Sequence, residues 1–381
     1  MSLTAEIRQC YKHEGPFVTA YFDGSRNTET ASHAVELRWQ ALRERLAEAG
    51  ADQPTLDAMQ AGLDSERSWP GRHGHLLLGA GGQLLLDEVT DEPPATELAD
   101  VGPAPHLMPF LAQRSETVPS VVVIADRTGA NIYVNAGDSA ARLTLNPEQV
   151  SGADQHPVHK TGRNDWSESH FQRRVENSWN ENATDVAHVV GKHVRELAAR
   201  TVLVAGDVRA RNLVLHALAE ELPPTVDITE TTAGGRAEGA SLAAVTEAAH
   251  DAVLRVRWRD RREILAKLQQ GVARADFGVT GIDEVLQALR SGQVETLVLS
   301  DDPRSTLRAW IGHDPLQLAL TEDELTALGI QQPVPLRLDA ALIRAVAASN
   351  ADLLITPNAH SYLTDGIGAV LRYARNPGTV S

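Results

Sequence analysis

The chain has 381 residues, a hydrophobic fraction of 42% and a formal net charge of −16 at pH 7. This length predicts two or three domains, and no apolar run approaches the ~18 residues of a transmembrane helix. The single cysteine, Cys10, excludes an internal disulfide and a zinc site built from cysteines. The acidic balance argues against unselective nucleic-acid binding over the whole surface, although a local basic patch is compatible with it.

The first residues carry no positive segment followed by an apolar stretch, so we expect no secretory signal and a cytoplasmic protein. Residues 17–22 are β-branched and aromatic, which predicts a strand. Residues 31–49 show an amphipathic helical pattern, and Leu56 to Leu63 mark a second helix. Two Leu-Leu-Leu runs flank Gly79–Gln83, which predicts a hairpin because glycine supplies the positive φ of a tight turn. A proline-rich segment follows the hairpin, and we place a domain boundary near Pro119.

The middle of the chain predicts an α/β layer. Residues 121–125 form a buried strand, residues 126–129 a turn, and residues 130–134 the partner strand. After a polar loop and a long helix come a buried strand at 201–207, a helix at 211–222 and a short strand at 226–228. This alternation implies a sheet with at least partly parallel pairing.

The polar loop and the long helix that follows it have the least generic composition. The helical pattern runs from Phe171 to Leu197, and cations precede it or fall in its first turns: His156, His159, Lys160, Arg163, His170, Arg173 and Arg174. A basic loop at a helix N-terminus brings cations, backbone N–H groups and the positive helix end together, which suits phosphate. Trp166 offers a flat surface for a base or a ribose. A solvated loop before a surface helix is the alternative that these residues leave open.

The last third begins with a long helical run at 241–270 that carries five arginines at positions 255, 257, 259, 261 and 262. Alternate positions lie about 200° apart on a helix, so we expect a solvated, salt-bridged helix and no single basic stripe. A helix at 282–289, a strand at 294–299, a helix at 342–348 and a strand at 352–356 predict a second α/β unit.

Two strings in this last third carry a resemblance. The first comprises Phe277-Gly278-Val279, Glu284–Leu289 and Gly292–Leu297, and the second is Asp365–Tyr373. In this order they resemble the C-terminal domain of archaeal and eukaryotic class 1 release factors and Pelota. The preceding segments resemble the first and middle domains of that family. The resemblance implies an α/β (α+β) fold with mixed sheets and flanking helices, in three domains at 1–118, 119–235 and 236–381.

The functional motifs of that family are missing. Active release factors carry Gly-Gly-Gln on the middle-domain loop, where this chain reads Lys160 to Ser167. A hydrolytic water needs a small loop dominated by backbone, whereas Asn164-Asp165-Trp166 is bulky and partly anionic, so we expect no esterase activity. Gly81-Gly82-Gln83 falls in the predicted hairpin of the first domain, and we interpret it as a turn. The stop-codon motif Asn-Ile-Lys-Ser is also absent, and its neighbourhood here contains Ser32 and His33.

A chain with this domain plan and neither motif resembles the bacterial branch of the family, which includes the Balon-like ribosome hibernation factors. The resemblance implies a stress-response protein that elongation factor Tu delivers to the A site of an idle 70S ribosome. There the protein would contact 23S and 16S rRNA and block translation without catalysis. We expect it to need no cofactor or metal and to bind no DNA or membrane. The residues implied at the peptidyl-transferase centre are His159, Lys160, Thr161, Gly162, Arg163, Asn164, Asp165, Trp166, Arg173 and Arg174. Ser32 and His33 would face the decoding centre.

Two alternatives stay open at the level of the sequence. One is a peptidyl-tRNA hydrolase that uses His156, His159, Asp165 or Glu168 in place of the glutamine. The other is a Pelota-like factor that rescues stalled ribosomes. The chain contains no Ser-His-Asp or HExxH arrangement that would favour the enzyme.

Overall fold

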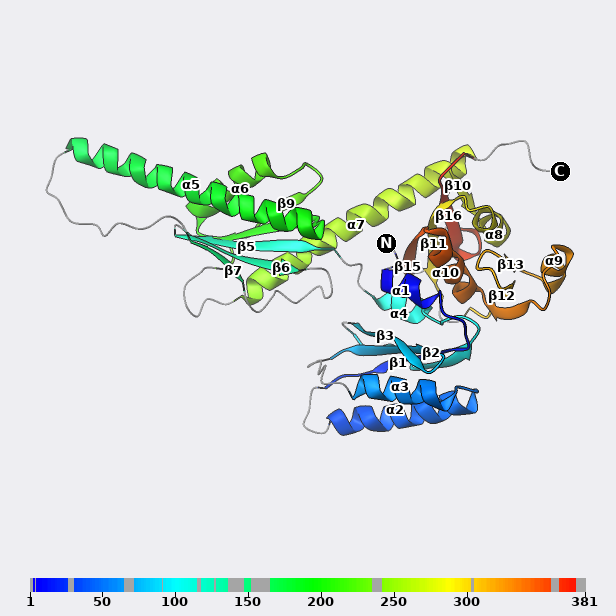
Figure 1. Ribbon diagram of the computed structural model, residues 1–381. Helices are drawn as coiled ribbons and strands as arrows, with labels where there is room; N and C mark the ends of the chain where they lie inside the picture. Colours follow the sequence, from blue (N-terminus) through cyan, green and yellow to red (C-terminus); the bar gives the residue numbers. More distant parts are fainter. Residues whose placement is uncertain are drawn as a thin grey trace. The chain divides into compact units, whose positions relative to one another are not determined.

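The computed structural model describes residues 3, 5–26, 31–64, 72–90, 92–114, 118–126, 128–135, 147–151, 165–234, 242–302, 305–357 and 363–374. They form mixed sheets with flanking helices, so the predicted α/β fold is confirmed (Figure 1). The chain divides into two compact units, one of residues 1–115 with 261–381 and one of residues 116–260. The division into three domains at 118/119 and 235/236 stays a prediction.

An antiparallel sheet forms the N-terminal part of the first unit. Its strands lie in the order β3 (Gln83–Thr90), β2 (Gly74–Ala80), β1 (Phe17–Asp23) and β4 (Leu98–Gly102). Helices α2 (Ala31–Glu48) and α3 (Gln53–Leu63) pack on one face, where Trp39 is fully buried beside Phe22 at 6.1 Å between ring centroids. Asp52 caps α3, because its Oδ1 accepts the Thr55 N–H at 2.9 Å. The strand and both helices predicted here are confirmed.

The predicted hairpin between β2 and β3 is also confirmed. Gly81 and Gly82 form its two-residue turn with φ of 57° and 76°, as a turn with two left-handed residues requires. The Gly82 N–H donates to Thr55 Oγ1 at 2.8 Å, which ties the turn to α3. Gln83 is the first residue of β3 and is exposed, so the tripeptide is part of a structural turn.

The C-terminal part of the first unit is a second α/β layer. Its main sheet has the order β10 (Gly278–Thr280), β16 (Ile367–Leu371), β11 (Val294–Asp301) and β15 (Asp352–Pro357), with β11 and β15 parallel. A small sheet contains β12 (Arg308–Ile311), β13 (Leu318–Ala319) and β14 (Val334–Arg337). Helices α8 (Ile282–Arg290), α9 (Glu322–Ala327) and α10 (Leu338–Ser349) accompany them, with the short 3-10 helix η1 (Thr364–Gly366). The four elements predicted between 282 and 356 are confirmed.

The two parts of the first unit share one hydrophobic core, which includes Ile7 of α1 (Ala5–Cys10), Phe110 of α4 (Met108–Gln113) and Val346 of α10. Arg8 of α1 reinforces this contact at the C-terminal end of α10. Its guanidinium donates to the carbonyls of Val346 at 3.1 Å, Ala347 at 3.0 Å and Ala351 at 2.7 Å. A cation at the negative end of a helix satisfies carbonyls that lack helical partners.

His106 lies buried in this first unit, and its titration gives a pH prediction. Its Nδ1 is buried with no hydrogen-bond partner among the residues that the structure describes. Burial lowers the pKa of the imidazole, and Arg337 lowers it further, against the opposing carboxylates of Asp339 and Asp100. The pKa of His106 in the folded state therefore lies below its value in the unfolded chain. The free energy of unfolding is unaffected by this group above about pH 6.5, and it decreases as the pH falls from there toward the lowered folded pKa.

We therefore expect the free energy of unfolding of the first unit to decrease between about pH 7.5 and about pH 5. His106→Gln, whose amide does not titrate in this range, should reduce that decrease. Urea unfolding at several pH values measures it, with His33→Gln as the control because His33 is exposed. An equal slope for wild type and His106→Gln would contradict the assignment.

The second unit is a five-stranded sheet in the order β7 (Glu148–Ser151), β6 (Gly129–Asn135), β5 (Ser120–Asp126), β8 (Thr201–Gly206) and β9 (Asp227–Glu230). Strands β5, β8 and β9 run parallel, and β6 is antiparallel to both of its neighbours, as the predicted partly parallel layer requires. Helices α5 (Asp165–Leu197) and α6 (Val208–Glu221) cover the face of Val121 and Val123. The first part of α7 (Ala243–Arg274) covers the opposite face.

Candidate functional site

Helix α5 is anchored to the sheet through the second part of its length. Its buried side chains recur at spacings of three and four from Ala183 onward, and they pack on β5 and β6: Ala183, Val186, Ala187, Val190 and Val194. His193 adds a polar contact, since its Nε2 lies 2.6 Å from Glu148 Oε2 of β7. These positions fall within the helical pattern that the sequence predicted from Phe171 to Leu197.

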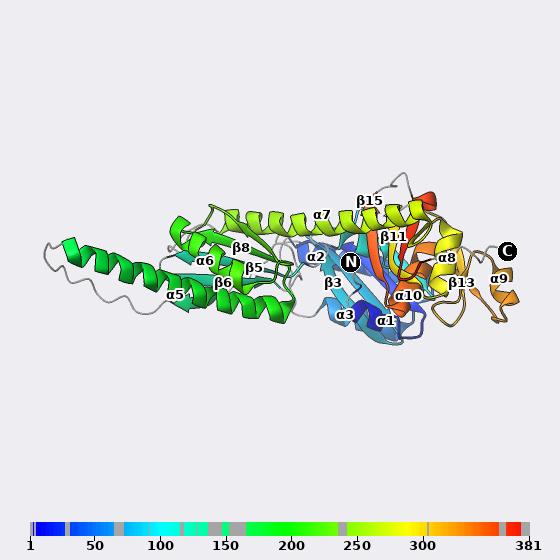
Figure 2. The same ribbon diagram turned by 90° about the horizontal axis from the view of Figure 1, so that it is seen from above.

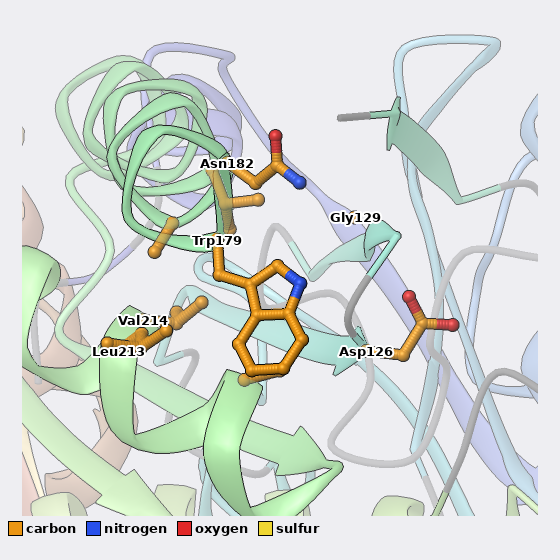
Figure 3. A pocket seen from close by; sticks show the side chains of 9 residues that line it. Asp126, Gly129, Trp179, Asn182, Leu213 and Val214 are labelled. Carbon is orange, nitrogen blue, oxygen red and sulfur yellow. The ribbon is translucent and has the colours of Figure 1, made fainter. Parts of the chain in front are cut away.

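Trp179 marks the place where α5 reaches the end of the sheet. Figure 3 shows its indole between the β5–β6 turn and helix α6, with Asp126 on one side and Leu213 and Val214 on the other. The cavity that these residues line holds about 20 Å³, which is room for a single water. This place is therefore a packing contact and not a ligand pocket. It fixes α5 against the turn, which is itself closed by Thr128 N–H donating to Asp126 Oδ1 at 2.7 Å.

The helix continues beyond this anchor toward its N-terminus. Residues 165–178 precede Trp179, and at about 1.5 Å per residue they correspond to roughly 20 Å of helix. Figures 1 and 2 both show this part of α5 extending past the end of its own sheet. The fold thus presents the first turn of α5 at a distance from the core of the second unit.

The structure places the predicted site residues in three groups. His159, Lys160, Thr161, Gly162, Arg163 and Asn164 lie outside the described residues. Arg173 and Arg174 lie within α5, as predicted. Ser32 and His33 lie in the first turn of α2 in the other unit, where His33 Nδ1 is 3.6 Å from Glu36 Oε2. The roles of all these residues stay predictions.

The start of the helix corrects one boundary. We expected Asp165 and Trp166 to belong to the loop, but they are the first two residues of α5. A carboxylate at the first helical position is favoured by the positive end of the helix dipole, which explains the earlier start. The predicted tip is therefore shorter, and its last two residues have a helical backbone.

One structural feature beside the site was not predicted. Gly206 ends β8 with φ of 106°, and the following Asp207 caps α6 by accepting the N–H groups of Arg209 at 3.0 Å and Ala210 at 3.3 Å. Glycine followed by aspartate after a buried strand is a helix-start signal that we had included in the strand. This junction fixes α6, on which Trp179 rests.

Within the described ranges, no group of three or more histidine, cysteine or acidic side chains is arranged to hold a metal ion. No helix in the described part of the chain is long and apolar enough to cross a membrane. The predicted lack of a metal and of a cofactor stays a prediction.

Residues 119–274 match a family model described as bacterial archaeo-eukaryotic release factor family 2. The chain is also similar to the uncharacterized protein Rv2629 of Mycobacterium tuberculosis, with 27% identity over 97% of this chain and 96% of the relative. The matched segment contains the whole sheet of the second unit, helix α5 and helix α7.

Solved structures of archaeal proteins align over nearly the full length. Pelota of Archaeoglobus fulgidus matches with 14% identity, a TM-score of 0.37, and coverage of 98% of this chain and 94% of that one. Archaeal Pelota in a model of the ribosome-bound protein with ABCE1 matches with 15% identity, a TM-score of 0.40, and coverage of 98% and 96%.

Proposed function

We propose that this chain, whose residues 119–274 match the model of bacterial archaeo-eukaryotic release factor family 2, is a ribosome-binding hibernation factor. It occupies the A site of idle 70S ribosomes, from the decoding centre to the peptidyl-transferase centre. It blocks translation there without hydrolysis. The observation that carries the proposal is the extension of α5, which presents its N-terminal turn away from the sheet.

The extended helix is suited to reach into a cavity lined by RNA. Its second part is fixed by the apolar face from Ala183 to Val194, so the first part is held by a continuous helical backbone. Its N-terminus carries the positive end of the helix dipole. In the sequence, Lys160 and Arg163 precede the helix and Arg173 and Arg174 follow within its first ten residues. Trp166 supplies an aromatic face for a base.

The composition of the tip supports blocking over catalysis. Release-factor chemistry needs a glycine-dominated loop that positions water, and Asn164, Asp165 and Trp166 stand at that place here. Since Asp165 and Trp166 begin α5, their backbone is committed to the helix. Ser32 and His33 at the start of α2 are proposed to face the decoding centre. Delivery by elongation factor Tu and a cytoplasmic location belong to the same proposal.

The Gly-Gly-Gln of the first unit should have no part in this function. Gln83→Ala is expected to leave ribosome binding unchanged and stability within about 0.5 kcal/mol, because Gln83 is exposed and the turn depends on the two glycines. Gly81→Val is the matched change, and it should destabilise the hairpin by roughly 1–2 kcal/mol because φ is positive there. Loss of binding in a folded Gln83→Ala protein would overturn this interpretation.

Salt dependence of ribosome binding tests the proposal. We expect the purified protein to co-sediment with 70S ribosomes, with an affinity that falls as salt rises because phosphate contacts release counterions. Each contact adds roughly 0.7–0.9 to the slope of log affinity against log salt. A peptide-release assay on the same complexes should give no release above the background without factor. An affinity that is independent of salt, or peptide release that depends on the α5 tip, would reject the proposal.

A further inference from the structure

Helix α7 carries an exposed tryptophan on the second unit. Trp258 is 59% exposed, the largest aromatic side chain that the described surface presents to this extent. Arg255 and Arg259 are also exposed, three residues before it and one residue after it. Positions three and four apart share one side of a helix. Arg255, Trp258 and Arg259 therefore form one face, which we call the α7 face.

The opposite side of the helix explains why this face is free of the core. Val253 and Val256 are buried with Val118, and Ala249 packs on the sheet one turn earlier. Positions two apart lie about 200° around a helix, so burying Val256 turns Trp258 outward. Arg255 and Arg259 are four apart and share the exposed side. Arg257 and Arg261 are half-buried, so the five arginines form no single stripe, as expected.

The charges on the α7 face are available to a ligand. The side chain of Arg255 makes no ion pair or hydrogen bond with any residue that the structure describes, although Asp251 lies one turn away on the same helix. Arg259 Nη1 lies 3.3 Å from Asp227 Oδ1, and both side chains are partly exposed, at 44% and 28%. Such exposed pairs contribute little, so phosphate can compete for the arginine. The neighbouring Asp260 is already held by both terminal nitrogens of Arg200.

We propose that the α7 face is a second RNA-contact surface, on which an unpaired base stacks on the Trp258 indole while Arg255 and Arg259 contact the flanking phosphates. An aromatic plane between guanidinium groups matches the alternation of base and phosphate in single-stranded RNA. The chain has a net charge of −16. The two arginines of the α7 face therefore provide a local site where RNA phosphate is attracted. The proposal rests on the proposed function only in taking ribosomal RNA as the RNA concerned.

The test compares four variants on two ligands, intact 70S ribosomes and protein-free ribosomal RNA. Trp258→Ala should weaken binding to both by about ten-fold or more, and Trp258→Phe should recover part of the loss because a smaller ring still stacks. Arg255→Ala should reduce the salt slope by roughly 0.7–0.9. Arg209→Ala is the matched control, because Arg209 is an exposed arginine of the same unit on helix α6, and it should leave binding and slope unchanged.

Unfolding curves establish that Trp258→Ala and Arg209→Ala are equally folded, and the two ligands separate the possible failures. If wild-type protein does not bind ribosomes but binds free RNA in a way that depends on Trp258, the proposed function is rejected and this inference stands. Ribosome binding that is equal for wild type and Trp258→Ala would overturn the inference and keep the function. A Trp258 effect on ribosomes without any effect on free RNA would indicate a protein contact and would also overturn it, as would wild-type protein that binds neither ligand.

Discussion

Gly206→Ala is expected to destabilise the unit of residues 116–260 by roughly 2–6 kcal/mol. Gly206 has φ of 106°, and a Cβ at this position would lie 2.0 Å from the carbonyl oxygen of Ala125. That oxygen is part of β5 and accepts the N–H of Asp207 at 3.0 Å, so it cannot move without breaking the junction of β8 with α6. The strained φ and the forced displacement each cost about 1–3 kcal/mol, roughly 2–6 kcal/mol together.

Urea unfolding of Gly206→Ala measures this loss, and Gly50→Ala is the control matched for backbone conformation. Gly50 has φ of 99°, but no atom lies within 4 Å of the position of its added Cβ. Gly50→Ala should therefore show only the conformational cost, about 1–3 kcal/mol. If both variants lost the same stability, the close approach of Gly206 to Ala125 would have no energetic role.

Loss of ribosome occupancy is the second large effect that we expect, from a variant that combines Lys160→Ala, Arg163→Ala and Trp166→Ala. Removing a stacking tryptophan costs about 5- to 150-fold in affinity, and two lost phosphate contacts should lower the salt slope by roughly 1.4–1.8. The unit should stay folded, because the core contacts of the described α5 side chains, from Trp179 onward, do not involve these three residues.

The control for this variant removes the same number of cations elsewhere in the unit. Lys192 lies in the anchored part of α5 and Arg209 in the first turn of α6, and both are exposed. The Lys192→Ala, Arg209→Ala double variant should keep near wild-type occupancy and slope. If control and tip variants weakened binding equally, the effect would come from net charge and the tip would have no specific role.

Local patterns in the sequence predicted most of the elements. Trp39 and Leu42 on an amphipathic stretch predicted α2, and two glycines between leucine runs predicted the β2–β3 turn, because these signals depend on residues close in sequence. The alternation of strands and helices around residues 121–228 likewise predicted the partly parallel sheet of the second unit.

Features that depend on distant partners were not predicted. Arg8 contacts carbonyls at 346, 347 and 351, and no local pattern near residue 8 indicates a helix end so far along the chain. The exposure of Trp258 was missed because a helical pattern shows which residues share a side but not which side is buried. Which side is buried was decided by Val118 and the sheet. Of the candidate site, the sequence predicted the long helix and its cations, and it placed the start of the helix two or more residues too late.

A reconstruction of the protein on idle 70S ribosomes, combined with a peptide-release assay on the same sample, tests the central claim most directly. The proposal predicts density for the N-terminal turn of α5 and the loop of Lys160 and Arg163 at the peptidyl-transferase centre, with α2 toward the decoding centre and no peptide release. A tip that lies away from the peptidyl-transferase centre, or peptide release that disappears in the Lys160, Arg163 and Trp166 variant, would contradict it.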